Sequence, residues 1–147
     1  MISALKTTGL EALVVGSTAA ILQGAPLMTQ DIDLLVRDTE RNREKLATLC
    51  SALGGSAVEI TPLSTTKRIV GLAVGVDILF DEISGGLAFA SLRSRAVEVE
   101  IGPAVAVVAS LEDVIASKRA ADRPKDRAQL PILEDTLRVK RALDQPK

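Results

Sequence analysis

Two aspartates lie one residue apart inside an apolar run, Asp31–Val36 (DIDLLV), and this feature constrains the fold more than any other. Because side chains of a strand alternate between its two faces, Asp31 and Asp33 point to one face and Ile32 to the other. Aspartate is depleted in strands, and neighbouring carboxylates repel each other. The run therefore predicts a strand with one apolar face and one face on which a further group offsets two negative charges.

A divalent cation would remove this conflict. Carboxylate oxygens are natural ligands of Mg²⁺, which also keeps waters and takes substrate phosphate oxygens. A third carboxylate, Asp77, lies in another apolar run, GVDILF, and a neighbouring strand could bring it beside the pair. We interpret Asp31, Asp33 and Asp77 as candidate ligands of Mg²⁺ or Mn²⁺. The alternative is a solvated sheet face, since D-x-D patterns also occur by chance.

The dipeptide Gly16-Ser17 follows the apolar run Leu10–Val15, which we predict to be a strand, and precedes a short helical stretch that ends near Gln23. Free backbone N–H groups at a helix N-terminus can bind phosphate. We therefore predict that Gly16 and Ser17 hold phosphate. The alternative is an ordinary turn in which Ser17 only caps the helix.

The rest of the chain mixes helical and strand patterns. We predict helices from Thr39 to Gly54, from Gly85 to Arg93, from Ser110 to Asp122, and from Pro124 onward with a kink or restart at Pro131. We predict strands at Val58–Ile60, within Arg68–Phe80, at Val97–Ile101 and at Val105–Val108. This mixture predicts an α/β or α+β protein, with residues 1–147 forming a single domain.

Several absences exclude whole classes of site. The 147 residues contain no His, Trp or Tyr and one cysteine, Cys50. A histidine-based triad, histidine metal ligands, a cysteine zinc site and an internal disulfide are therefore excluded. The net charge of -1 gives no bulk attraction to nucleic acid or membrane, and no apolar run reaches transmembrane length. We expect a cytoplasmic protein with no membrane or disulfide partner.

In chain order, the apolar strand, Gly-Ser, the short helix, Asp-Ile-Asp-Leu and the later Val-Asp-Ile resemble the nucleotidyltransferase superfamily of DNA polymerase β type. The C-terminal LEDVIASKRAADRPKDRAQLPIL resembles the small bacterial branch related to AbiEii-type toxins and MNT-type antitoxins. The resemblance covers nearly the whole chain. It implies a mixed β-sheet core flanked by helices, and magnesium-dependent transfer of an NMP from an NTP to a hydroxyl with release of pyrophosphate.

The resemblance also assigns roles by position. It implies that Gly16 and Ser17 hold the triphosphate, that Asp31 and Asp33 bind metal, and that Asp77 completes the site and helps to activate the acceptor hydroxyl. Two metal ions could then stabilise both the attacking and the leaving oxygen.

Three residues of the C-terminal region are further candidates. Lys118 continues the predicted buried stripe of its helix, where an unpaired ammonium would be costly. It either meets the triphosphate or extends its charge past apolar surface to water. Lys125 is a candidate for binding the acceptor, against the alternative of a solvated face. Asp126 points inward and either supports the site or forms a structural ion pair.

The acceptor could be a tRNA end, a protein hydroxyl or a small molecule such as an aminoglycoside. Larger relatives carry an added helical domain for the acceptor, so we expect a macromolecular acceptor here, tRNA or a partner protein, with a toxin–antitoxin role. The alternative function is a non-catalytic antitoxin or scaffold. The related branch usually has Arg soon after Gly-Ser, where Thr18 and Ala19 stand here, and Asp at the position of Gln129. Three clustered acids favour the enzyme.

Overall fold

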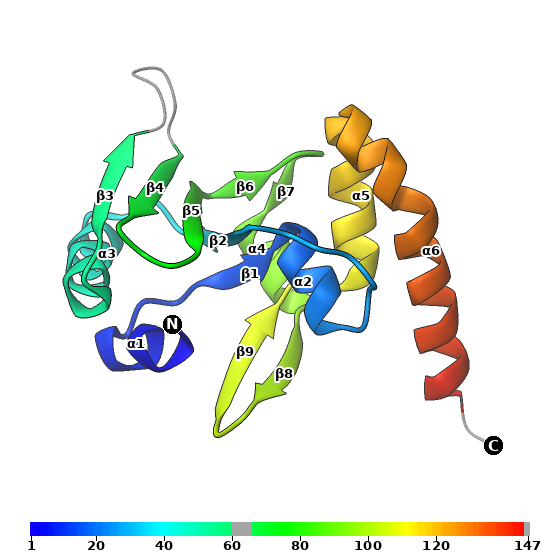
Figure 1. Ribbon diagram of the computed structural model, residues 1–147, viewed down its shortest axis with the longest axis horizontal. Helices are drawn as coiled ribbons and strands as arrows, with labels where there is room; N and C mark the ends of the chain where they lie inside the picture. The colour runs from blue at the N-terminus through cyan, green and yellow to red at the C-terminus, as the bar shows by residue number, and fades with distance from the viewer. Residues whose placement is uncertain (60–65, 146–147) are drawn as a thin grey trace.

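The computed structural model describes residues 1–59 and 66–145. Its centre is a seven-stranded mixed sheet with strand order β3-β4-β5-β2-β1-β9-β8 (Figure 1). The strands are β1 (Leu13–Val15), β2 (Asp31–Val36), β3 (Ser56–Glu59), β4 (Lys67–Val70), β5 (Gly75–Phe80), β8 (Val97–Ile101) and β9 (Ala104–Val108). A separate small hairpin consists of β6 (Glu82–Ile83) and β7 (Leu87–Ala88). The mixed sheet confirms the predicted fold class.

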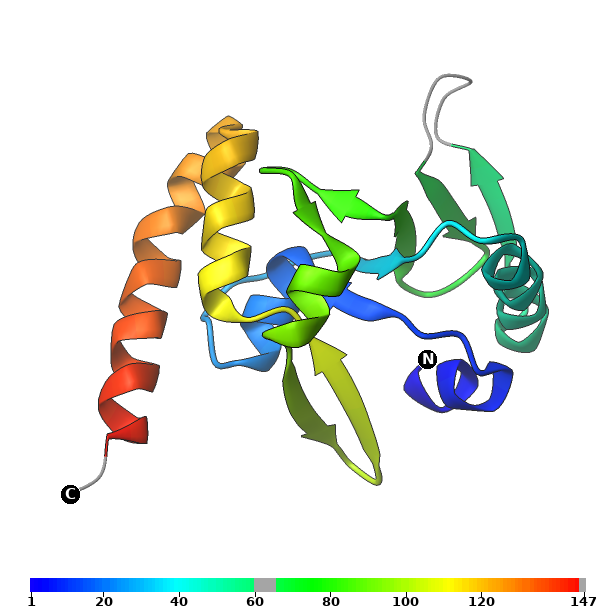
Figure 2. The ribbon, with the colours of Figure 1, turned by 180° about the vertical axis from the view of Figure 1, so that it is seen from behind.

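Helices lie at both ends of the sheet. They are α1 (Ile2–Thr8), α2 (Gly16–Leu22), α3 (Glu40–Leu53), α4 (Phe89–Ser94), α5 (Leu111–Ala121) and α6 (Pro124–Asp144). The two opposite views show α1 and α3 at one end and α5 beside α6 at the other (Figures 1 and 2). No helix among the described residues is long and apolar enough to cross a membrane.

Strand β2 changes character along its length. Asp31 and Asp33 at its start are half-buried, whereas Leu34, Leu35 and Val36 are at most 1% exposed. Burial of each such apolar side chain stabilises the fold by about 1.5–3 kcal/mol. The second half of β2 is therefore anchored in the core, and this anchoring holds its acidic first half in place.

Several element boundaries differ from those expected. The helix predicted from Gly85 begins at Phe89, because Gly85 and Gly86, both with positive φ, form the turn between β6 and β7. Helix α6 runs through Pro131 without a restart. Helix α1 was not predicted at all. Ile60, the predicted end of the strand that starts at Val58, lies outside the described residues.

Helix α2 also begins differently from the prediction. Its N-cap is Val15, and no side chain makes a capping hydrogen bond there. Ser17 therefore lies within the first turn of α2, and the alternative in which Ser17 only caps this helix was wrong. By contrast, Thr39 and Ser110, at which two of the predicted helices start, do cap them: their side chains accept hydrogen bonds from the backbone N–H of Asn42 and Asp113, respectively.

Candidate active site

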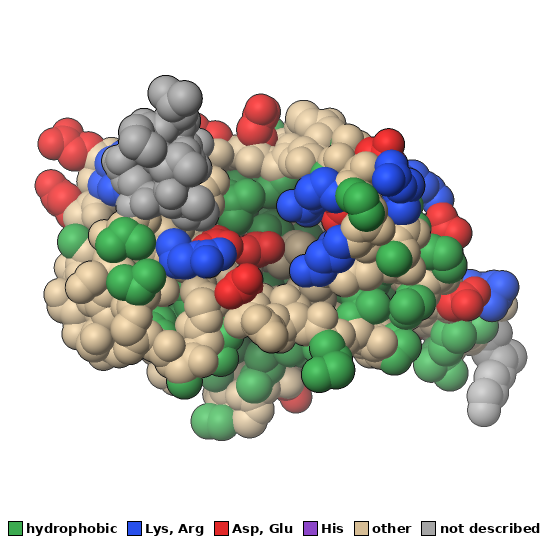
Figure 3. All heavy atoms as spheres, turned by 45° about the horizontal axis from the view of Figure 1, so that its top comes forward, with side chains coloured by type: hydrophobic (Ala, Val, Ile, Leu, Met, Phe, Trp, Pro, Cys, Tyr) green, Lys and Arg blue, Asp and Glu red, His purple; other side chains and the backbone are tan. Residues whose placement is uncertain are grey.

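Strand pairing brings the three aspartates to one face of the sheet. Strands β2 and β5 run parallel and place Asp33 directly opposite Asp77. Directly opposed residues of neighbouring strands share a face, and Asp31 lies two residues before Asp33 on that same face. All three carboxylates line one cavity of about 320 Å³. Figure 3 shows this hollow, with acidic side chains inside it and basic side chains facing them.

Two glycines leave room for these carboxylates. Gly75 on β5 lies opposite Asp31, and a Cβ added at Gly75 would collide with the Asp31 carboxylate. Gly16 has a φ of +67°, and a Cβ there would lie 2.8 Å from Oδ2 of Asp33. The Gly16 backbone therefore approaches Asp33 more closely than any other residue type allows. The sequence indicated Gly16, but the role of Gly75 depends on strand register.

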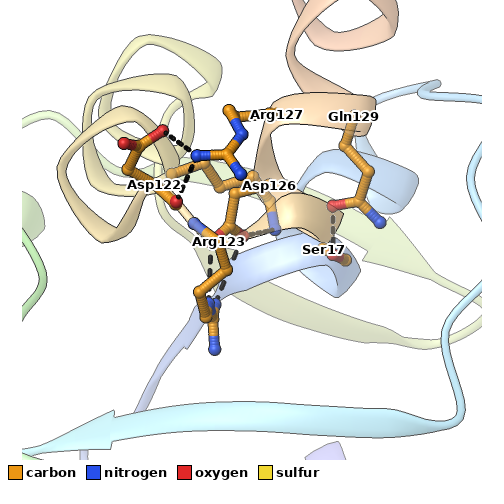
Figure 4. A network of polar contacts seen from close by, with 7 residues as sticks. Ser17, Asp122, Arg123, Asp126, Arg127 and Gln129 are labelled. Atoms are coloured by element: carbon orange, nitrogen blue, oxygen red, sulfur yellow. Dashed lines mark hydrogen bonds and ion pairs between the residues drawn. The ribbon is translucent and has the colours of Figure 1, made fainter.

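The first turn of α2 faces the acids. Strand β1 is antiparallel to β2 and places Val15 opposite Asp33, so α2 starts beside the acidic cluster. Gly16 and Ser17 line the same cavity as the three aspartates. The Ser17 hydroxyl donates a hydrogen bond to Oε1 of Gln129 on α6, at 3.3 Å (Figure 4). The turn thus lies where a phosphate could contact both it and the acids.

A buried basic group forms the opposite wall. Lys118 on α5 lines the cavity and is only 7% exposed, and its Nζ lies 3.5 Å from Oδ1 of Asp126. Asp126 is fully buried and accepts hydrogen bonds from the Arg123 backbone N–H and from its Nε, at 3.1 and 2.7 Å (Figure 4). Lys118 therefore does not extend its charge to water, and the predicted inward direction of Asp126 is confirmed. Lys125 and Arg123 also line the cavity.

The pKa values of the two walls reflect burial and neighbouring charge. Burial raises the pKa of Asp33 above its usual value, and the charges of Asp77 and Asp31 raise it further. Burial lowers the pKa of Lys118, and the charge of Asp126 offsets part of this effect. Burial alone would raise the pKa of Asp126, but hydrogen bonds and charge from Arg123 outweigh it, so this pKa is lowered.

An arginine that the sequence analysis did not single out lies among the acids. Strands β4 and β5 pair Arg68 with Asp77, and Nε and Nη2 of Arg68 donate to the two carboxylate oxygens of Asp77 at 2.7 and 3.0 Å. Nη2 of Arg68 also lies 3.9 Å from the Asp31 carboxylate. The available signal was the short hairpin connecting these strands, which makes residues 68 and 77 neighbours.

The face of the sheet that carries Asp31, Asp33 and Asp77, called the acid face below, has the oxygen ligands that a hard cation prefers. These ligands are not arranged around a cation position. Within the described part of the chain, no three acidic or cysteine side chains form a group ready to hold a metal ion. Arg68 binds both oxygens of Asp77 instead. The oxygen donors are those that Mg²⁺ prefers, and the charges of Asp77 and Asp31 add to burial in raising the pKa of Asp33. The donor set therefore fits a divalent cation, and the ligand roles of Asp31, Asp33 and Asp77 stay a prediction.

Comparison with known proteins identifies the family. Residues 1–145 match the family model described as "Nucleotidyl transferase of unknown function (DUF2204)". The chain belongs to the DUF2204 family. The protein is thus a nucleotidyltransferase, as the sequence predicted, and family membership favours the enzyme over a non-catalytic scaffold. No curated protein sequence matches this DUF2204 protein significantly.

Solved structures share its fold at low sequence identity. The antibiotic-resistance enzyme ANT(2")-Ia in complex with adenylyl-2"-tobramycin has a TM-score of 0.66 and 16% identity, covering 92% of this chain and 84% of that one. The lincosamide antibiotic adenylyltransferase LnuA, with lincomycin bound, has a TM-score of 0.65 and 11% identity, covering 91% and 92%. A Thermotoga maritima protein proposed to be a nucleotidyltransferase has a TM-score of 0.60 and 21% identity, covering 99% and 89%.

Proposed function

We propose that this DUF2204 protein transfers an NMP from an NTP to an acceptor hydroxyl in a reaction that depends on Mg²⁺ or Mn²⁺. The observation that carries the proposal is the direct pairing of Asp33 with Asp77 beside the first turn of α2, with Lys118 across one cavity. Acids that hold cations, a turn that binds phosphate and a buried ammonium are what this reaction requires at one place.

Each wall of the cavity has a distinct task in this proposal. Asp31, Asp33 and Asp77 would hold the divalent cation, which when bound neutralises charge on the phosphates and orients them. Backbone N–H groups at Gly16 and Ser17 bind the triphosphate. Asp77 accepts the proton of the acceptor hydroxyl as the new oxygen–phosphorus bond forms.

The departing pyrophosphate needs positive charge on the opposite wall. As the bond between the α-phosphorus and the bridging oxygen breaks, negative charge collects on the leaving group. Lys118 offsets that negative charge, and Lys125 provides a second positive charge from the start of α6. Asp126 supports the site from behind, because it is fully buried and pairs with both the buried Lys118 and the more exposed Arg123.

The acceptor that we propose first is macromolecular, either tRNA or a partner protein. A small hydroxylated compound is the second candidate. It is favoured by the likeness in fold to two antibiotic adenylyltransferases, of which this chain covers 84% and 92%. Chains of nearly this length thus occur with small acceptors. Association with a toxin–antitoxin pair, and location in the cytoplasm, are further parts of the proposal.

Incubation with each α-labelled NTP and Mg²⁺ tests the proposal. Separate reactions contain total tRNA, the product of a neighbouring gene, an aminoglycoside or a lincosamide, and one contains the protein alone. We expect label on one of these acceptors, with none when EDTA replaces Mg²⁺ or when Asp33→Asn replaces the wild type. Label on an antibiotic alone would overturn the macromolecular acceptor, and label that persists in Asp33→Asn would overturn the catalytic role of the acids.

A further inference from the structure

The guanidinium of Arg68 provides a positive charge next to the acid face. It is the direct cross-strand partner of Asp77 and binds both of its carboxylate oxygens, at 2.7 and 3.0 Å. Its guanidinium also reaches to 3.9 Å from Asp31. An arginine fork matched to two carboxylate oxygens is a well-defined arrangement, in contrast to a loose surface pair. Arg68 therefore neutralises carboxylates that a divalent cation would need as ligands.

The side chain of Arg68 can leave this position without disrupting the core. It is 42% exposed, whereas the Asp77 side chain that it contacts is only 15% exposed. The acid thus stays fixed by its strand, while the more exposed arginine can move into solvent. Lys118 and Lys125 act on Asp33 from across the cavity, and neither forms an ion pair with the three aspartates in the described part of the chain.

We propose that Arg68 is the counter-ion of the acid face in the nucleotide-free protein and that a divalent cation must displace it from Asp77. This inference rests on the proposed function. Arg68 then weakens cation binding as long as no nucleotide is present. The triphosphate offers the displaced guanidinium a new anion, and arginine forks bind phosphate oxygens as well as carboxylates. Arg68 therefore couples cation binding to nucleotide binding.

A purely structural role for Arg68 makes a different prediction. Arg95 provides the comparison, because it is 48% exposed and its Nε donates to a poorly exposed carboxylate, Asp113, at 2.9 Å. Asp113, the partner of Arg95, does not line the acidic cavity, whereas Asp77, the partner of Arg68, does. If Arg68 only ties β4 to β5, then removing either arginine should affect folding alone and leave cation binding unchanged.

The test is Mn²⁺ binding without nucleotide, measured by electron paramagnetic resonance of free Mn²⁺ for the wild type, Arg68→Met, Arg68→Lys and the control Arg95→Met. A neighbouring arginine opposes binding of a proton to an aspartate by about ten-fold or more, and a dication is repelled at least as strongly. We expect about ten-fold tighter Mn²⁺ binding in Arg68→Met and a smaller gain in Arg68→Lys, which keeps the charge. Arg95→Met should bind Mn²⁺ as the wild type does.

Two further measurements complete the test. A non-hydrolysable NTP analogue should tighten Mn²⁺ binding of the wild type and reduce its difference from Arg68→Met. In EDTA the melting temperature of Arg68→Met should fall, because three acids lose their counter-ion, and Mn²⁺ should raise it by more than in the wild type. The rise in melting temperature on adding Mn²⁺ thus compares the Arg68 variants even where one of them is less stable than the wild type.

The inference is overturned if Arg68→Met binds Mn²⁺ no more tightly than the wild type, or if Arg95→Met gains as much. If either of these results is found while the wild type still transfers NMP, the proposed function stands and only the role of Arg68 is removed. Absence of both Mn²⁺ binding and transfer in all variants would instead overturn the proposed function itself.

Discussion

Replacement of Asp126 by asparagine should destabilise the protein far more than replacement of its partner Lys118 by methionine. Asp126 is fully buried and faces two cations, Arg123 and Lys118. In Asp126→Asn, the Arg123 side chain, which is 69% exposed, can turn to water. The Lys118 side chain, 8% exposed, cannot, so its ammonium stays buried without its countercharge.

The structure sets the size of this effect. Removing one partner of a buried ion pair costs about 3–5 kcal/mol when both charges are trapped. Because only Lys118 is trapped here, we expect a loss of about 2–3 kcal/mol, or about 5–10 °C in melting temperature for a chain of this length. Lys118→Met keeps the apolar stem and leaves the bonds from Arg123 to Asp126 intact, so its cost should stay below about 1 kcal/mol. The double variant should recover part of the loss.

Urea and thermal unfolding, followed by circular dichroism in EDTA, measure these differences. Asp122→Asn is the matched control, since the Asp122 pair with Arg127 is exposed and asparagine tolerates the positive φ of 49° at that position. The control should change stability by less than about 0.5 kcal/mol. Equal losses in Asp126→Asn and Lys118→Met, or no recovery in the double variant, would refute this reasoning.

Three further predictions concern the cavity. Gly16→Ala should cost about 1–2 kcal/mol of stability because of the positive φ at that position, and contact with Asp33 should also weaken NTP binding. The control Gly102→Ala, with a φ of +59° and nothing within 4 Å, should lower stability alone. Equal NTP affinity in both variants would argue against a phosphate role for the turn. Asp33→Asn should abolish transfer. The pKa of Asp33 is raised above 3.8, so the folded wild type binds more protons than the unfolded chain and loses stability as the pH rises through the folded-state pKa. In EDTA, Asp33→Asn should therefore be more stable than the wild type at pH 7 by up to about 1 kcal/mol, with no difference near pH 3. A gain that persists at pH 3 would show that ionisation of Asp33 is not its cause. Lys118→Met should fold but bind NTP about ten- to a hundred-fold more weakly, as measured by calorimetry, and unchanged affinity would make Lys118 structural.

The parts of the site that lie on single segments could be predicted from the sequence. The alternation in Asp31–Val36 fixes which residues share a face, and the strand–Gly-Ser–helix pattern fixes where α2 begins to within two residues. The predicted inward direction of Lys118 and Asp126 follows from helical spacing in the same way. Local periodicity is enough in these cases because each feature depends on backbone geometry within one element.

The remaining features depend on how separate segments pair. Gly75 acquires its importance from the register of β5 against β2, which no single segment reveals, and Arg68 comes near Asp31 through the same register. The hydrogen bond between Ser17 and Gln129 joins residues 112 positions apart. Gly85 and Gly86 were equally compatible with a helix start and with the hairpin turn that the structure contains. Strand register and tertiary packing decided each of these outcomes.

The most direct test of the central claim compares NTP labelled at the α- or the γ-phosphorus in a single turnover with the acceptor. We predict that the α-label appears on the acceptor, that the γ-label appears only in pyrophosphate, and that one pyrophosphate is released per transfer. Asp77→Asn should reduce the rate at least about a hundred-fold, the lower end of what a positioned acid or base contributes. Transfer of the γ-label to the acceptor, or a wild-type rate in Asp77→Asn, would contradict NMP transfer by the paired aspartates.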